Sequence, residues 1–197
     1  MVKKTRKPEK RGRKAADADA ILDSACRVFS RKGYFRATVD DVIADAGIGK
    51  GTVYHHFRDK EGLLLAVLGR VAREVNRRVD LCLQGDPKLE EGLEAVAREI
   101  LAFFAARPEP LRLFVREGAL SIPAVRKTMG FVVRSMNGQI AELLGGPSTI
   151  RDAAVFNGMV FGLLRQKLGF ANELIHPKKE AAFLAAFFLK GFRGMRR

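Results

Sequence analysis

The sequence has little of the chemistry on which disulfides, metal sites and most enzyme active sites depend. It contains two cysteines and three histidines in 197 residues. Cys26 and Cys82 both lie in apolar helical patterns, which favours buried free thiols over a disulfide or metal ligands. His55 and His56 are adjacent, and the sequence shows no spaced set of metal ligands and no nucleophile signature. We therefore expect no metal site, no cofactor and no enzymatic activity.

Long apolar runs are also missing. No run approaches the roughly 20 residues that a membrane-spanning helix needs. The N-terminal stretch, MVKKTRKPEKRGRK, is basic and has no apolar segment behind it. The sequence therefore predicts a cytoplasmic protein with no stable membrane association.

Positive charge, by contrast, is abundant and concentrated at the N-terminus. The formal net charge is +14, and residues 1–14, with eight Lys or Arg and a single acid, carry half of it. A segment with so few apolar residues is predicted to be a disordered arm. Such an arm attracts polyanions, either nucleic acid or an anionic membrane. The alternative, a merely solubilising end, stays open on this stretch alone.

Residues 15–60 have the periodicity of short helices. A second helix in this stretch is predicted to begin after Thr38, the N-cap, with Asp41 as its capping-box partner. Gly47 can adopt a positive φ and so end that helix. The first helix has a core-facing stripe formed by Ile21, Leu22, Ala25, Cys26 and Phe29. Short helices joined by a tight turn are typical of a helix-turn-helix.

A third helix, predicted to start at residue 50, is short and largely polar. On a helical wheel Val53 and Phe57 form its inner face, while Gly51 and His55 point outward. A glycine costs about 1 kcal/mol relative to alanine in a helix, which is understandable if a partner must come close to it. The hydroxyl, imidazole and ammonium groups of this helix can bond phosphate oxygens or base edges. DNA is therefore the expected partner.

The stretch from Ile21 to about Leu68, above all TVDDVIADAGIGKGTVYHHFRDKEGLLLAVL, resembles the DNA-binding region of the TetR family of bacterial transcriptional regulators. The resemblance rests on the helix-turn spacing, the K-G-T-x-Y-H-x-F core and the D-K-E that follows. It implies a three-helix head that presents its third helix to a DNA groove. Together with Gly51, the residues expected to contact DNA are then Thr38, Lys50, Thr52, Tyr54, His55 and Lys60.

Each of these side chains also has a simpler interpretation. His55 is equally an ordinary surface histidine, Tyr54 a partly buried aromatic residue and Lys60 a solvated lysine. Their joint spacing favours DNA over these separate explanations. The sequence departs from the family at Gly49, where serine is common; glycine still caps a helix, but it offers no hydroxyl contact.

The remainder of the chain is predicted to form an all-helical body over residues 61–197. No useful period-2 alternation occurs, and Gly or Pro breaks separate the helical patterns. After the connecting helix, which the segment QGDP ends, the predicted helices cover residues 88–106, 109–118, 122–144, 149–173 and 178–193. We therefore expect an all-α fold in three parts: the arm (1–14), the helix-turn-helix head (15–60) and a ligand-binding and dimerisation body (61–197).

The last two predicted helices have more apolar surface than one core would use. The final helix is apolar almost all round over its central turns, so it is either buried or packed against a second chain. The family resemblance implies a homodimer that pairs through these two helices and reads a palindromic operator. The expected interface residues are Val160, Phe161, Leu164, Phe183, Phe187 and Phe188.

The resemblance also implies that the body encloses a pocket for a small-molecule effector. The candidate residues are Phe103, Phe104, Phe114, Arg116, Phe131, Arg134, Met136, Phe156 and Met159. The aromatic residues among them are equally consistent with an ordinary core, and the arginines with surface residues. The net positive charge of residues 61–197 favours an apolar ligand with an acidic head, such as an acyl compound.

We therefore predict a TetR-like DNA-binding transcriptional regulator, a repressor that a small-molecule effector releases from its operator. The alternative is a peripheral membrane protein that uses the basic arm and the apolar C-terminal helix, since the two together resemble an interfacial anchor. The helix-turn-helix spacing favours the first interpretation, because membrane binding does not require it.

Overall fold

The computed structural model describes residues 9–116, 121–171 and 173–195, and the side chains of residues 9–15, 114–116, 193 and 195 lie outside this description. Within these ranges the regular elements are all helices, which confirms the predicted all-α class. No helix in the described part of the chain is long and apolar enough to cross a membrane. The chain divides into two compact units, Met1–Val67 and Leu68–Arg197, each with its own core. The division falls within α4 (Lys60–Leu83), seven residues beyond the expected end of the head.

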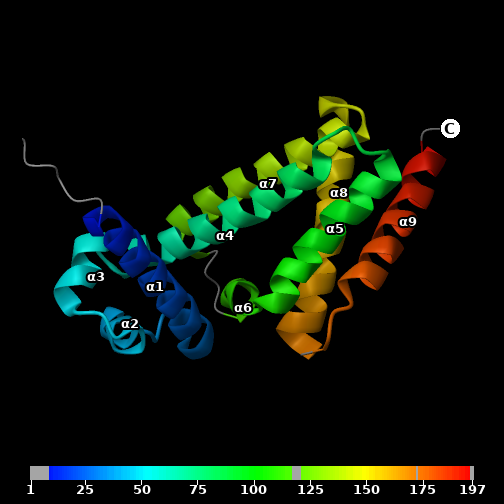
Figure 1. The fold of residues 1–197 in the computed structure, drawn as a ribbon. Coiled ribbons are helices and arrows are strands. Elements are labelled where there is room, and N and C mark those ends of the chain that lie inside the picture. Colours follow the sequence, from blue (N-terminus) through cyan, green and yellow to red (C-terminus); the bar gives the residue numbers. More distant parts are fainter. Residues whose placement is uncertain (1–8, 117–120, 172, 196–197) are drawn as a thin grey trace, which may run out of the picture. The chain divides into compact units, whose positions relative to one another are not determined.

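The first unit is a helical head (Figure 1). It contains α1 (Glu9–Lys32), α2 (Val39–Ala46), α3 (Lys50–His56) and the first turns of α4, with α2 and α3 both packed against α1. Because α1 begins at Glu9, residues 9–14 of the expected disordered arm are helical, whereas residues 1–8 lie outside the described residues. Lys, Arg, Glu and Ala are good helix formers, and extending an existing helix avoids the cost of nucleation.

Local capping sets the geometry of the helix-turn-helix. The Thr38 hydroxyl accepts a hydrogen bond from the Asp41 N–H at 3.1 Å, and the Thr38 N–H donates to the Asp41 carboxylate at 2.9 Å. This is the predicted capping box, and it fixes the start of α2. Gly47 ends α2 with φ of 64°, and Gly49 caps α3 without a side-chain hydrogen bond. The predicted ends of α2 and the predicted start of α3 are thus confirmed.

The second unit is a bundle. After the remainder of α4 it contains α5 (Leu89–Ala106), α6 (Glu109–Arg116), α7 (Pro123–Leu144), α8 (Ile150–Leu164) and α9 (Pro177–Met195), close to the predicted ranges. A 3-10 turn (Pro147–Thr149) precedes α8, and a π-helix (Arg165–Ala171) continues it. Helix α5 packs against α9, and α7 packs against α8 (Figure 1).

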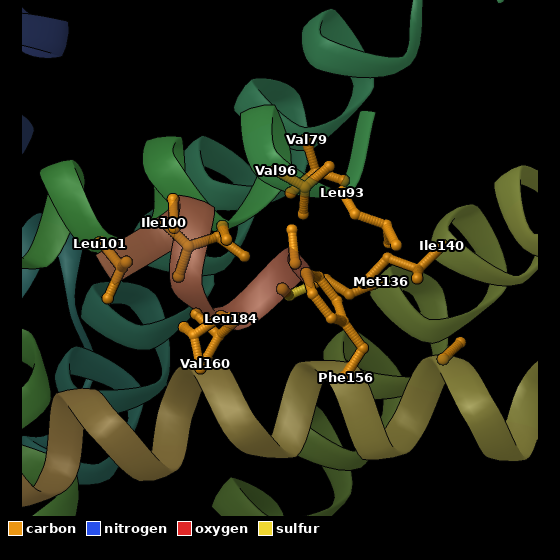
Figure 2. Packing of buried hydrophobic residues seen from close by; sticks show 14 of the residues in the cluster. Val79, Leu93, Val96, Ile100, Leu101, Met136, Ile140, Phe156, Val160 and Leu184 are labelled. Atoms are coloured by element: carbon orange, nitrogen blue, oxygen red, sulfur yellow. The ribbon is translucent and has the colours of Figure 1, made fainter. Parts of the chain in front are cut away.

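Aliphatic and aromatic side chains fill the interior of this bundle (Figure 2). The labelled residues come from α4, α5, α7, α8 and α9: Val79, Leu93, Val96, Ile100, Leu101, Met136, Ile140, Phe156, Val160 and Leu184. One polar pair is buried beside them, where the amide nitrogen of Asn157 on α8 donates to the amide oxygen of Asn137 on α7 at 2.9 Å. The hydrogen bond offsets part of the cost of burying two amides.

Candidate nucleic-acid interface

Helix α3 presents its polar side chains outward, as the helical wheel predicts. Val53 is fully buried and anchors the helix to the head. Gly51, His55 and Tyr54 are exposed, with 45% of the tyrosine accessible to solvent, and Thr52 is partly exposed. Hydroxyl and imidazole groups therefore lie on the face away from the core, where a second molecule can reach them. A β-carbon added at Gly51 would meet no atom of the protein within 4 Å, so the fold does not need a glycine there.

Lys50, at the start of α3, is held by an acid on α2. Its ammonium nitrogen lies 3.1 Å from a carboxylate oxygen of Asp40 and 5.9 Å from the ring centre of Tyr54. The hydrogen bond to Asp40, reinforced by the charge of that carboxylate, raises the pKa of Lys50. Both side chains are largely exposed, so the pair stays accessible to a partner. The sequence predicts a DNA contact for Lys50 and a favourable place for Asp40 at the positive end of α2, but it does not predict that the two side chains pair.

Lys60, at the start of α4, is held in place by contacts with the segment that follows α1. The Asp59 carboxylate accepts a hydrogen bond from the Gly62 N–H at 2.7 Å and so caps α4. The Lys60 ammonium donates to the Phe35 carbonyl at 3.1 Å and lies 4.5 Å from the ring centre of Tyr34. Partial burial lowers the pKa of Lys60. Because an ammonium has three N–H donors, this bond to Phe35 leaves others for a phosphate.

Ion pairs join α1 to α2 on the head. Arg27 and Asp45 lie 2.7 Å apart, and Lys32 and Asp41 lie 2.6 Å apart. The hydrogen bond from Lys32, followed by that from the Thr38 N–H, lowers the pKa of Asp41 to about 2. These pairs fix α2 against α1, and therefore help to fix the turn that leads to α3. Only the capping role of Asp41 was predicted, because cross-helix pairs have no fixed spacing along a sequence.

Five of the nine predicted effector residues lie in or against the core of the bundle, whereas two others are exposed. Phe103, Phe104, Met136 and Phe156 are buried in the core of the bundle, and Met159 is partly buried. In contrast, Phe131 and Arg134 are exposed, with 69% of Phe131 accessible. The side chains of Phe114 and Arg116 lie outside the described residues.

An open depression of about 720 Å³ lies elsewhere on the body. Its lining comes from α5, α9 and the residue before α9: Glu94, His176, Pro177, Lys178, Lys179 and Ala182. None of the predicted effector residues contributes to it. Among the described residues no three His, Cys, Asp or Glu side chains converge where they could hold a metal ion.

The expected dimer residues fall into two groups. Phe183 and Phe187 on α9 are 61% and 63% exposed, and their rings stack with centres 5.9 Å apart. The other group, Val160, Leu164 and Phe188, is buried within the unit, and Phe161 is partly buried. The inward face of each of these helices packs into its own bundle, so among the six expected interface residues Phe183 and Phe187 are the ones exposed to a second chain.

Comparison with known proteins gives matches to one type of regulator. Residues 21–67 match the family model described as bacterial regulatory proteins, tetR family. Over 88 residues the chain is 39% identical to an HTH-type transcriptional repressor of Mycobacterium tuberculosis, and the match covers 45% of this chain and 42% of the other. The chain spans 42% to 61% of the length of three curated relatives that it matches, this repressor and two regulators of Bacillus subtilis.

Solved structures show the same fold over most of the chain. The fatty acid degradation regulator FadR from Bacillus halodurans has a TM-score of 0.78 at 18% identity, covering 88% of this chain and 98% of the other. The transcriptional regulator FadR from Bacillus subtilis, solved in complex with stearoyl-CoA, has a TM-score of 0.74 at 17% identity over the same shares. At such low identity these similarities concern the fold alone.

Proposed function

Because the chain belongs to the TetR family of bacterial transcriptional regulators, we propose that it binds a palindromic DNA operator as a homodimer and represses transcription. The observation that carries this proposal is the outward face of α3, where Tyr54 and His55 are exposed while Val53 anchors the helix. Polar groups are ordinary on an exposed helix face, but the fold has no need for a glycine there. DNA supplies both phosphate oxygens and base edges for the polar groups.

The proposed DNA contacts are of two kinds: contacts to phosphates position the protein on the duplex, and contacts to base edges read the sequence. Lys60 and the Thr38 hydroxyl, at the starts of α4 and α2, bind phosphates, since helix N-termini suit anions. Lys50, Thr52, Tyr54 and His55 form the contacts of α3 with the groove and its edges. Changing Lys60 to Ala then weakens binding to all duplexes alike and flattens the dependence of affinity on salt. A loss confined to one operator contradicts the phosphate role.

Dimerisation uses the exposed face of α9. The stacked rings of Phe183 and Phe187 are large apolar groups left in contact with water, and a second copy of the chain would bury them. A twofold dimer presents two recognition helices to half-sites about one DNA turn apart or somewhat more. Repression follows when the bound dimer blocks a promoter.

The proposed effector is an acyl compound with an acidic head. Support comes from the fold, which is that of a FadR solved with stearoyl-CoA, and from the aromatic and aliphatic interior of the bundle. The body has excess basic residues that can bind an acidic head. An effector that binds better to a conformation whose heads do not match the operator releases DNA by differential affinity. No catalytic step is part of this proposal, and we place the protein in the cytoplasm.

Selection of bound duplexes from a random pool, followed by sequencing, tests the DNA-binding function. An enriched palindrome is the expected result, and it supplies the operator for effector screening with acyl compounds. Salt-sensitive binding without any enriched sequence contradicts a sequence-reading regulator. Sedimentation with anionic vesicles that persists in Tyr54→Ala and Lys60→Ala then favours the peripheral-membrane alternative.

A further inference from the structure

An acidic side chain lies beside the proposed DNA-reading surface. Asp40, in the first turn of α2, is 69% exposed, and its carboxylate lies 3.1 Å from the ammonium of Lys50 at the start of α3. If α3 enters a DNA groove, Asp40 approaches a polyanion together with Lys50. A carboxylate so placed weakens binding to phosphates in general, so its presence calls for an explanation.

The fold supplies only a small part of that explanation, because an exposed acid in the first turn of α2 is only weakly stabilised by the positive end of the helix. The capping box of α2 is formed by Thr38 and Asp41, and Asp40 takes no part in it. Asp41 also forms the ion pair with Lys32 that joins α2 to α1. An ion pair between two exposed side chains, such as that of Asp40 with Lys50, adds little to stability.

We propose that Asp40 is a positioning residue that sets sequence discrimination by holding Lys50 away from phosphates. This inference rests on the proposed DNA-binding function and names a residue outside the contact set assigned above. Lys50 can bind a phosphate either beside the Asp40 carboxylate, where the two anions repel each other, or by leaving Asp40, whose carboxylate then faces the DNA without its partner. Binding to unrelated sequences is therefore weakened.

At the operator the same pair can remain intact. A lysine ammonium donates to the N7 and O6 atoms of guanine, and a carboxylate accepts from the N4 amino group of cytosine. Lys50 and Asp40 together therefore match a step in which these groups lie side by side in the major groove. The operator sequence offers an acceptor to Lys50 and a donor to Asp40, whereas a random sequence offers a partner to only one of the two side chains.

The expected size of the effect follows from counterion release. Each additional phosphate contact steepens the dependence of log affinity on log salt by about 0.9. Freeing Lys50 for one phosphate therefore tightens binding to unrelated duplexes about five-fold at roughly 0.15 M salt. Because the operator gains less, the ratio of operator to unrelated affinity falls in Asp40→Asn.

The experiment compares Asp40→Asn with the parent by fluorescence anisotropy, using the selected operator and a scrambled duplex between about 50 and 200 mM salt. Asp86→Asn is the matched control, because it removes the same charge from a body loop where φ is 49°, a conformation that asparagine accepts well. Asp40→Glu keeps the charge and is expected to keep the parent ratio. In the double variant Asp40→Asn/Lys50→Met, the dependence of log affinity on log salt is expected to lose the extra steepness seen in Asp40→Asn.

The possible outcomes test the role of Asp40 separately from the proposed DNA-binding function. A parent protein that prefers no sequence overturns the proposed function. A parent that prefers an operator, with an unchanged ratio and slope in Asp40→Asn, overturns the role of Asp40 alone. An equal change in Asp86→Asn also overturns it, because net charge would then account for the effect. Circular dichroism melts check that each variant is folded, as expected while Asp41 still caps α2.

Discussion

Replacing Gly51 by alanine tests whether the glycine serves the stability of the fold or the binding of DNA. The residue is exposed in the first turn of α3, and an added β-carbon would meet nothing within 4 Å. Alanine lowers the entropy of the unfolded chain and is the better helix former, so the free energy of unfolding should rise by about 0.5–1 kcal/mol. For a chain of this size that raises the melting temperature by about 1–4 °C.

DNA affinity should move in the opposite direction. If the groove or the phosphate backbone comes close to the α3 backbone at Gly51, a methyl group there displaces the contacts on either side of it. A charge-assisted hydrogen bond is worth about 1.5–3 kcal/mol, so losing one of them weakens operator binding by roughly 10- to 100-fold. The variant is therefore expected to be more stable and less active, a combination that a simple folding defect does not produce.

The two effects are measured by far-UV circular dichroism melts and by fluorescence anisotropy with the selected operator. Gly138→Ala on α7 is the control, because an added β-carbon there also meets nothing within 4 Å. It should stabilise the protein and leave operator binding unchanged. Unchanged affinity in Gly51→Ala would refute the close approach of DNA, and a lower melting temperature would refute the open space seen at this position.

Three further outcomes follow from the structure. The pKa of Asp41 is about 2 in the folded state, below the ordinary 3.8, so the stability that it contributes is complete above about pH 4 and is lost towards pH 2. Urea unfolding at several pH values should therefore show a flatter acid limb in Asp41→Asn, and an equally steep limb contradicts the pairing. Asn157→Leu leaves the buried amide of Asn137 on α7 without its hydrogen bond and should lower the free energy of unfolding in urea by about 1–3 kcal/mol; an unchanged value contradicts the role of this pair. Serine at both Phe183 and Phe187 should halve the mass in light scattering while helicity is kept, and Phe131→Ser, equally exposed on α7, should leave a dimer; a dimer that persists in the first variant places the interface elsewhere.

The head could be predicted in detail because its determinants are local in sequence. Thr38 and Asp41 are three residues apart, and a single glycine, Gly47, ends the helix that they begin. Such signals need no tertiary information. The contact of Lys50 with Asp40 and that of Lys60 with Phe35 join separate elements, and no spacing rule identifies them.

The helices of the body could be predicted from the sequence, but the residues that form a binding site or an interface on it could not. Periodicity locates a helix and its apolar face, and the predicted ranges agree with α5 and α7 to within a residue or so. Periodicity cannot say whether an apolar residue packs on its own bundle or remains exposed. Phe188 and Phe187 are neighbours in sequence, yet the first is buried and the second is exposed. The packing of α9 against α5 and α8 decides which face is covered, and the ring of Phe188 meets that of Phe156 on α8.

Two of the residues assigned to DNA, Gly51 and Tyr54, are not explained by folding. Val53 and Thr38 have evident structural roles as a buried anchor and a cap, whereas Gly51 weakens its helix and Tyr54 leaves an aromatic ring in solvent. Local choices that conflict with stability tend to mark functional positions. Asp40 gains only a weak interaction with the positive end of α2, and it neither forms the capping box nor joins α2 to α1, so by the same reasoning we propose it as a DNA-reading residue. A protein selected for stability alone would have little use for these three residues together on one surface.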